Sequence, residues 1–173
     1  AILPGIDLSE GAFKLDLTKA GLAVAGPAKL NGVAAKIDWS KAKGASAAKI
    51  AVATTLTENM RERMGIRLDS YLSGDIPVQL DIGSSEGGSR RIAVDADLSD
   101  VSMRVAAAGW SRPPVNGTKA TFDFVDSGKA GRRIENLKLD GKGLRLRGTV
   151  TLSANNALKV VDMDEIRLSE DDV

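Results

Sequence analysis

The stretch DIPVQLDIG, residues 75–83, carries the pattern that decides the fold. Apolar side chains occupy every second position, and the positions between them hold proline or polar residues. Because successive side chains of a β-strand point to opposite faces, this alternation predicts a strand with one apolar face and one hydrated face. The apolar set consists of Ile76, Val78, Leu80 and Ile82.

The same period of two recurs along most of the chain. Segments rich in glycine and asparagine at 25–27, 31–32, 84–89, 116–117 and 140–143 separate the runs, and such segments are typical of turns. The sequence therefore predicts a mainly β fold, a curved antiparallel sheet with short connections. The other apolar faces are formed by Phe13, Leu15, Leu17, Val33, Ala35, Ile37, Trp39, Ile50, Val52, Leu56, Ile92, Val94, Ala96, Leu98, Ala120, Phe122, Phe124, Leu144, Leu146, Val150 and Leu152.

One segment, residues 55–74, breaks this alternation. Met60 and Met64 lie four residues apart, which places them on one face of a helix. Thr55 and Glu58 have the spacing of a capping box, and Gly65 stands where a helix would end. We therefore expect a short helical insertion at 57–72, made of one or two helices, that caps an end or an edge of the sheet.

Length and composition exclude several classes of function. A chain of 173 residues suits a single domain. The 24 Lys and Arg residues nearly balance the 23 Asp and Glu residues, so no strong field attracts nucleic acid. Aromatic residues make up only 3% and offer few stacking platforms for bases. We expect no nucleic-acid partner.

The chain contains neither cysteine nor histidine. This removes thiolate nucleophiles, the commonest general base and the commonest transition-metal ligands. Serine–lysine dyads and carboxylate pairs remain as catalytic devices, but there is little aromatic surface to stack a sugar. We expect that the protein is not an enzyme and needs no cofactor or metal.

Clusters of charge have two interpretations each. The acidic clusters at 95–100 and 162–165 could hold Ca²⁺, but neither has the spacing of an EF-hand loop, and a hydrated strand face explains them better. Arginines could contact phosphate headgroups at a groove rim, or they could simply keep loops soluble. The arginines concerned are Arg61, Arg63, Arg67, Arg90, Arg91, Arg132 and Arg133.

The segment 97–117 resembles a motif of a known family. In it, Asp97-Leu98-Ser99 and an apolar run precede Gly109-Trp110-Ser111, Pro113-Pro114 and Gly117. This order is similar to a pattern of AsmA-like proteins that carry the DUF3971-type repeat, in which Lys often stands at the position of Arg112. The segments 25–39, 63–82 and 136–152 fit the same family, so the resemblance covers nearly the whole chain.

The resemblance implies a periplasmic protein of the Gram-negative cell envelope that is anchored in the inner membrane. Repeated β units of such proteins form a long sheet shaped like a taco or gutter, and relatives are regarded as bridge-like carriers of phospholipid in outer-membrane biogenesis. The implied partners are phospholipid and flanking repeats of the same chain. No catalytic residue comes with the family.

Residues 1–173 contain no apolar run of about 18 residues and do not start like a signal peptide. We therefore expect a single β-rich module that is a fragment of a longer envelope protein. Its membrane anchor and targeting signal would lie outside this stretch, and only those outside parts would contact the membrane.

An uncovered apolar face would suffice to bind an acyl chain, because each methylene removed from water gains about 0.8 kcal/mol. The alternative is a structural spacer, or a scaffold in outer-membrane protein assembly, whose apolar face is filled by its own helix and by neighbouring repeats. Under the first hypothesis, the phospholipid-binding groove is lined by Phe13, Leu15, Leu17, Ile76, Val78, Leu80, Ile82, Ile92, Val94, Leu98, Phe122, Phe124, Leu144, Leu146, Val150 and Leu152.

The run DLSDVSMRVAAAGW, residues 97–110, also belongs to this hypothesis. We expect Val101, Met103 and Val105 to extend the apolar lane, and Trp110 to close it. Three consecutive alanines at 106–108 would then let the sheet bend or a helix approach. Ordinary core packing against the helix at 57–72 explains the same residues equally well.

Overall fold

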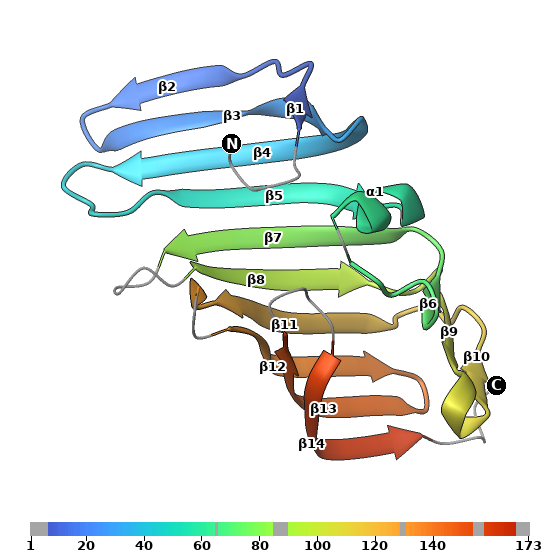
Figure 1. The fold of residues 1–173 in the computed structure, drawn as a ribbon. Helices are drawn as coiled ribbons and strands as arrows, with labels where there is room; N and C mark the ends of the chain where they lie inside the picture. The colour runs from blue at the N-terminus through green and yellow to red at the C-terminus, as the bar shows by residue number, and fades with distance from the viewer. Residues whose placement is uncertain (1–6, 65, 85–89, 129–130, 154–157, 169–173) are drawn as a thin grey trace.

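The computed structural model describes residues 7–64, 66–84, 90–128, 131–153 and 158–168. Most strands join one large antiparallel sheet that is not closed (Figure 1), so the predicted mainly β fold class is confirmed. At one edge, β2 (Lys14–Thr18) and β1 (Leu8–Ser9) both pair with β3 (Gly21–Leu30). The order across the sheet is β1 (Leu8–Ser9), β3 (Gly21–Leu30), β4 (Val33–Ala42), β5 (Lys49–Leu56), β7 (Ile76–Ser84), β8 (Arg90–Asp97), β11 (Lys119–Asp126), β12 (Arg132–Gly141), β13 (Leu144–Leu152) and β14 (Leu158–Leu168).

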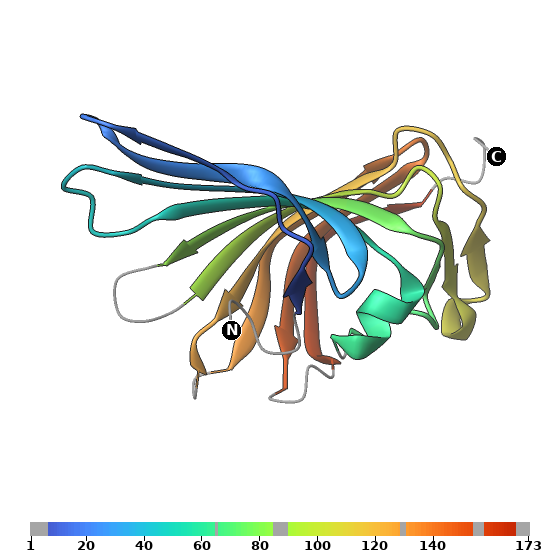
Figure 2. The same ribbon diagram turned by 90° about the horizontal axis from the view of Figure 1, so that it is seen from above.

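A smaller second layer covers one end of the apolar face of this sheet. It consists of α1 (Glu58–Arg63) and a three-stranded sheet in the order β10 (Trp110–Arg112), β9 (Ser102–Val105) and β6 (Leu72–Ser73). Figure 2 shows both parts at the same end of the large sheet. We call this second layer the cover. No helix among the described residues is long and apolar enough to cross a membrane.

The cover seals two groups of core side chains. On one side, Met60 of α1 packs with Leu30, Ala35 and Val52. The other group joins Met103 of β9 and the neighbouring Val101 to the large sheet. Its buried members from the large sheet and the turn after β8 are Ile76, Val78, Ala96, Leu98, Ala120 and Leu144.

The helical insertion is shorter than the sequence suggests. A single helix of six residues forms, and its N-cap is Thr57, whose side chain accepts a hydrogen bond from the Met60 amide (3.3 Å). The predicted cap at Thr55 is wrong, because Thr55 pairs with Pro77 and so still belongs to β5. The helix ends at Arg63, and Gly65 lies outside the described residues.

The pairing register lines up apolar side chains in rows that run across the strands. The row that we call the first row crosses every strand of the large sheet from β2 to β14 and lies farthest from the cover among these rows. The second and third rows lie successively nearer the cover, each about two residues further along a strand. The first row is Leu15, Val24, Trp39, Ile50, Ile82, Ile92, Phe124, Ile134, Val150 and Val161. The second row contains Gly26, Ile37, Val52, Leu80, Val94 and Phe122. The third row is Ala28, Ala35, Thr54, Val78, Ala96, Ala120, Leu139, Leu146 and Ile166.

Two irregularities keep these rows in step. Along β13, the first-row and third-row residues Val150 and Leu146 lie four positions apart, as alternation requires. Along β12 the corresponding residues, Ile134 and Leu139, lie five apart, and the pairing register shifts between them. The extra residue is absorbed as a bulge, so both side chains stay on the apolar face. β14 shows the same odd spacing and a register shift against β13.

Two predicted turns have different outcomes. Asn31 and Gly32 both have positive φ, 50° and 84°, and they connect β3 to β4 as a two-residue hairpin, which confirms that turn. The turn predicted at 25–27 is wrong, because β3 runs straight through it. Gly26 is needed there for another reason: a Cβ at this position would collide with the backbone of Ala12 and Phe13.

Among the described residues two arginines are buried, and they differ in their hydrogen bonding. Arg61 has no exposed surface; its Nη1 donates to the carbonyl oxygens of Leu56 and Gly74 (2.9 Å each), and its Nη2 donates to Asp69 (2.9 Å). These bonds tie α1 to the end of β5 and to the turn before β7. Arg112 is 8% exposed, and its buried Nη2 has no hydrogen-bond partner within the described part of the chain.

We expect opposite results when each of these arginines is replaced by methionine. Arg61→Met leaves two carbonyl groups and a carboxylate without their donor, and it should lower the free energy of unfolding by about 3–5 kcal/mol. Arg112→Met removes a buried donor that has no partner, and it should raise stability by about 1 kcal/mol. Thermal unfolding of both variants beside the parent chain measures this, and a loss of similar size in both would contradict the assignment.

Candidate functional site

The cover divides the apolar face into a sealed part and an exposed part. Third-row side chains next to the cover are buried from β3 to β11, whereas most of the first row keeps partial solvent exposure. We call the partly exposed apolar side chains of the first two rows the open surface. They are Val24, Ile37, Trp39, Ile50, Leu80, Ile82, Ile92, Val94, Phe122, Phe124 and Ile134.

Exposure of apolar side chains increases toward both edges of the sheet. On the β2 edge, Leu15 and Leu17 are 64% and 75% exposed. On the opposite edge, Val161, Ile166 and Leu168 of β14 are also largely exposed. The first row therefore has exposed side chains at both edges and partly exposed ones from Val24 to Ile134, while Val150 between Ile134 and Val161 is buried. Large apolar surfaces mark sites of interaction.

The expected groove residues fall into three groups. Leu80, Ile82, Ile92, Val94, Phe122 and Phe124 belong to the open surface. Phe13, Leu15 and Leu17 are exposed on or next to the β2 edge. The remaining residues are buried or partly buried: Ile76, Val78, Leu98 and Leu144 in the core beneath the cover, Leu146 packed against that core, and Val150 and Leu152 within β13.

Several residues of the open surface escaped the sequence-based list of groove residues. Val24 stands among alanines and glycines that resemble a turn, and Ile134 lies before the bulge of β12, where strict alternation fails. Trp39 and Ile50 showed the right alternation but were not assigned to the groove. In the sequence, only the five-residue spacing between Ile134 and Leu139 indicates that Ile134 faces the apolar side. That spacing can be interpreted only when the bulge in β12 is known.

Of the two interpretations of the run at 101–105, the structure supports core packing for Val101 and Met103. Val101 and Met103 do not extend the apolar lane, because they are buried in the group that the cover seals. The alanines at 106–108 form a 3₁₀ turn that ends at Gly109, whose φ is 63°. Trp110 packs against the sealed core. The run is thus part of the cover rather than of the surface beneath it.

Most of the arginines considered for phosphate recognition have protein partners. Arg61 is buried, as described above. Arg91 on β8 donates to Asp123 (2.9 Å) and to Glu135 (3.0 Å), and Arg133 also contacts Glu135 (3.1 Å). Arg132 donates to Asp126 (3.0 Å). These side chains stabilise the pairing of neighbouring strands on the sheet, so they form no free cationic rim.

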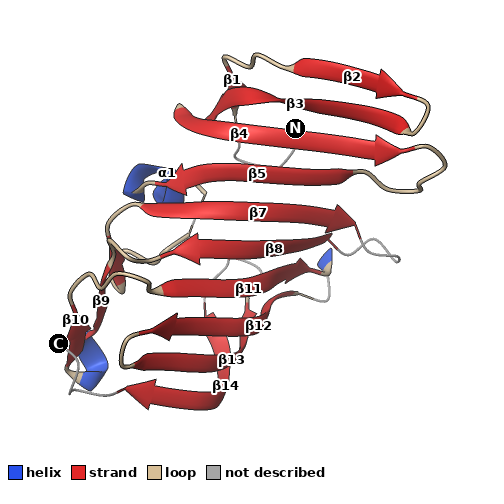
Figure 3. Ribbon diagram, turned by 180° about the vertical axis from the view of Figure 1, so that it is seen from behind, coloured by secondary structure: helices blue, strands red, loops and turns tan. Residues whose placement is uncertain are grey.

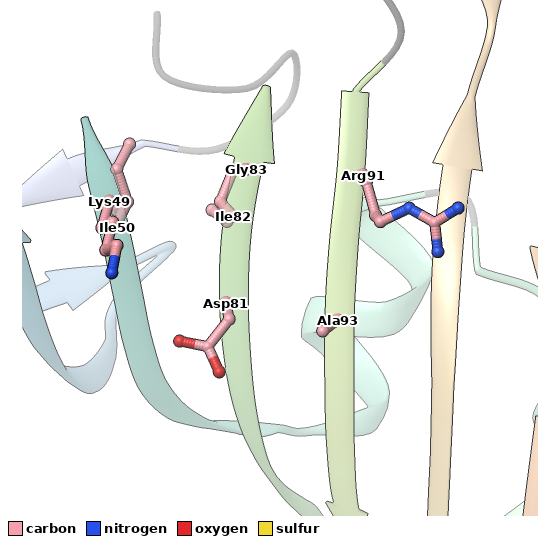
Figure 4. A pocket seen from close by; sticks show the side chains of 7 residues that line it. All are labelled: Lys49, Ile50, Asp81, Ile82, Gly83, Arg91 and Ala93. Atoms are coloured by element: carbon pink, nitrogen blue, oxygen red, sulfur yellow. The ribbon is translucent and has the colours of Figure 1, made fainter. Parts of the chain in front are cut away.

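A shallow depression lies on the face opposite α1 (Figure 4). Its volume is about 410 Å³, and it opens over Gly83, which has no side chain to fill the space. The guanidinium of Arg91 points toward β11, away from Gly83. Since the charged residues around it are exposed, it has no built polar site, and we assign no ligand to it. Its lining is Lys49, Ile50, Asp81, Ile82, Gly83, Arg91 and Ala93.

Of the acidic residues at 95–100, Asp97 stabilises a turn. Oδ1 of Asp97 accepts hydrogen bonds from the amide (3.0 Å) and the hydroxyl (2.6 Å) of Ser99, and Ser99 Oγ accepts from the Gly117 amide (3.1 Å). The hydroxyl and then the amide of Ser99 lower the pKa of Asp97. Within the described ranges, no three acidic side chains converge to hold a metal ion.

We expect Asp97→Ala to lower the free energy of unfolding at pH 7 by about 1 kcal/mol, because it removes the acceptor of this turn. The pKa of Asp97 is lowered in the folded chain, so its stabilisation is present above the ordinary value of 3.8 and is lost as the pH falls through the folded value. Denaturant unfolding against pH should therefore show the variant and the parent converging below pH 3.8.

The matched control is Asp95→Ala, which removes the same charge from the same exposed face of β8 but outside the turn. It should cost less stability than Asp97→Ala at neutral pH. Equal losses in the two variants would show that general charge, rather than the turn, is responsible.

Comparisons with protein-family models, with curated proteins and with solved structures found no match. The open surface, the cover and the two free edges are therefore interpreted from the residues of this chain.

Proposed function

We propose that this chain is a non-enzymatic module that binds the acyl chains of phospholipids on its open surface. The proposal includes its setting: an AsmA-like protein of the bacterial periplasm, anchored in the inner membrane, that conducts lipid toward the outer membrane. The observation that carries the binding function is the partly exposed first row, which crosses seven consecutive strands from Val24 to Ile134.

The dimensions of the open surface suit a long, thin guest. Six inter-strand spacings of about 4.8 Å give the row a length of about 29 Å. The second row runs beside the first over most of this distance, which makes the surface two side chains wide. About a dozen methylenes removed from water would contribute roughly 10 kcal/mol before the entropic costs of binding.

The chemistry of the row favours a guest that slides. Most of its side chains are aliphatic, so contact depends on area rather than on particular hydrogen bonds. The covered end of the strands forms a boundary on one side of the row, and the opposite strand ends are free of the cover (Figure 2). A guest lying along the row could therefore move across the strands without breaking a directional bond.

The spacer or scaffold function remains the second candidate. The observation in its favour is that the chain already fills part of its own apolar face, through Met60 on one side and through Val101 and Met103 on the other. In that case another protein segment would complete the cover over the open surface. The two functions differ in whether an acyl chain can reach the first row.

Fluorescence of the two tryptophans tests access to the open surface. Trp39 belongs to the first row, whereas Trp110 packs against the sealed core. We expect dibromostearic acid, used below its micelle concentration, to quench the Trp110→Phe variant, which retains Trp39. The Trp39→Phe variant should be quenched much less. Equal quenching of both variants, or of neither, would contradict acyl binding at the open surface.

A charge placed in the first row should abolish this binding. Ile92→Lys puts an ammonium group between Ile82 and Phe124, where desolvating it beneath an acyl chain is unfavourable. The matched control is Ala93→Lys on the same strand, whose new charge would face Asp81 and Asp123 on the opposite face. Titration with the brominated acid should show at least a tenfold weaker affinity for Ile92→Lys and no comparable loss for Ala93→Lys.

A further inference from the structure

The large sheet has two outer edges, one formed by β14 and the other by β2 and β1. Within the described residues, β14 pairs only with β13, and β2 and β1 pair only with β3. Figures 1 and 3 show these two edges at opposite ends of the sheet. A long edge strand with exposed apolar side chains presents unpaired amide and carbonyl groups, and such an edge is a template for pairing with another strand.

The directions of the two edges are compatible. Nine antiparallel pairings lead from β2 to β14, so these two strands run in opposite directions. If a second copy continues the sheet in the same order, its β2 therefore lies antiparallel to β14 of the first copy. The alternation of strand directions then passes through the junction without a break.

The registers of the two edges are compatible as well. Leu15 and Val161 are the two ends of the first row. Nearer the cover, Leu8 continues a row through Leu30 and Val33, and Leu168 lies opposite Leu144. Leu8 and Leu15 are seven positions apart along one edge, and Val161 and Leu168 are also seven positions apart along the other. A single register therefore places Leu15 opposite Val161 and Leu8 opposite Leu168.

The same register brings opposite charges together. It places Lys14 of one copy opposite Asp162 of the other, and both side chains are exposed. Symmetric pairing of β14 with itself would instead bring the acidic cluster Asp162, Asp164 and Glu165 of one copy close to the same cluster of the other, and like charges opposite each other are unfavourable. Charge thus favours the head-to-tail arrangement over the symmetric one.

We propose that this chain binds a second copy of itself head to tail, with β14 of one copy pairing with β2 and β1 of the next. The sheet and its first row then continue from one copy into the other. Repetition of this contact is open-ended, because the two partner surfaces differ. Successive covers would lie about ten strand spacings, roughly 48 Å, apart and so would not collide. The interaction uses the edges and does not depend on acyl binding.

Cysteine cross-linking tests both the partner and the register, because the natural chain has no cysteine. Leu15→Cys and Val161→Cys are separate variants at well-exposed positions, 64% and 46%, so folding should be unaffected. With one variant labelled with ¹⁵N, we expect an oxidised mixture to yield mainly the mixed disulfide dimer by mass spectrometry. The register control, Leu8→Cys with Val161→Cys, should yield little.

Two outcomes would overturn the proposal. One is that Val161→Cys alone cross-links as fast as the mixture, which would indicate symmetric pairing of β14. The other is that the mixture yields no more dimer than the register control at the highest protein concentration reached. Neither outcome affects quenching of Trp39 by the brominated acid, so failure of this inference is distinguishable from failure of acyl binding.

Charge reversal gives an independent measurement in the unlinked protein. We expect Asp162→Lys and Lys14→Asp each to weaken self-association about threefold to tenfold in sedimentation experiments at low salt, and the double variant to recover it. Asp164→Lys, which changes the same charge on the same strand but opposite Ala12 in this register, should weaken it less. Absence of recovery in the double variant would contradict the assigned register.

Discussion

The alternation of side chains along paired strands is the constraint on which the rest of this structure depends. A slip of one residue in any pairing would transfer the apolar side chains of that strand to the hydrated face. The first row nevertheless passes without interruption from Leu15 to Val161. Bulges in β12 and β14 make this possible, because each absorbs an odd residue that would otherwise invert the faces.

Strand direction also explains why the cover lies at one end only. β5 and β8 run in the same direction, since each is antiparallel to β7 between them. The insertions that follow these two strands therefore emerge at the same end of the sheet, where β6 of one pairs with β9 of the other. Arg61 fixes the first insertion, and the hydrogen bonds among Asp97, Ser99 and Gly117 fix the start of the second.

Period-two alternation was sufficient to predict the class of the fold, the faces of most strands and the place of the helical insertion. It could not predict which apolar positions are sealed, because Met103 in the cover and Val94 beneath no cover alternate in the same way. Burial of Met103 arises from contact between segments distant in the sequence. Ile134 was missed because a bulge follows it. The glycine and proline at 26–27 resemble a turn, although Gly26 in fact allows the close approach of the backbone at Ala12 and Phe13.

The first row contributes side chains both to the open surface and to the two free edges. The two proposals therefore concern the same row of apolar side chains. A guest on the row lies across the strands, so the length available to it is set by the number of strands rather than by their length. A covering segment would shorten that path, whereas another strand added beside β2, where the row ends in the exposed Leu15, would lengthen it by about 4.8 Å. Pairing at the edges would thus change how far a bound chain can extend without changing any side chain that contacts it.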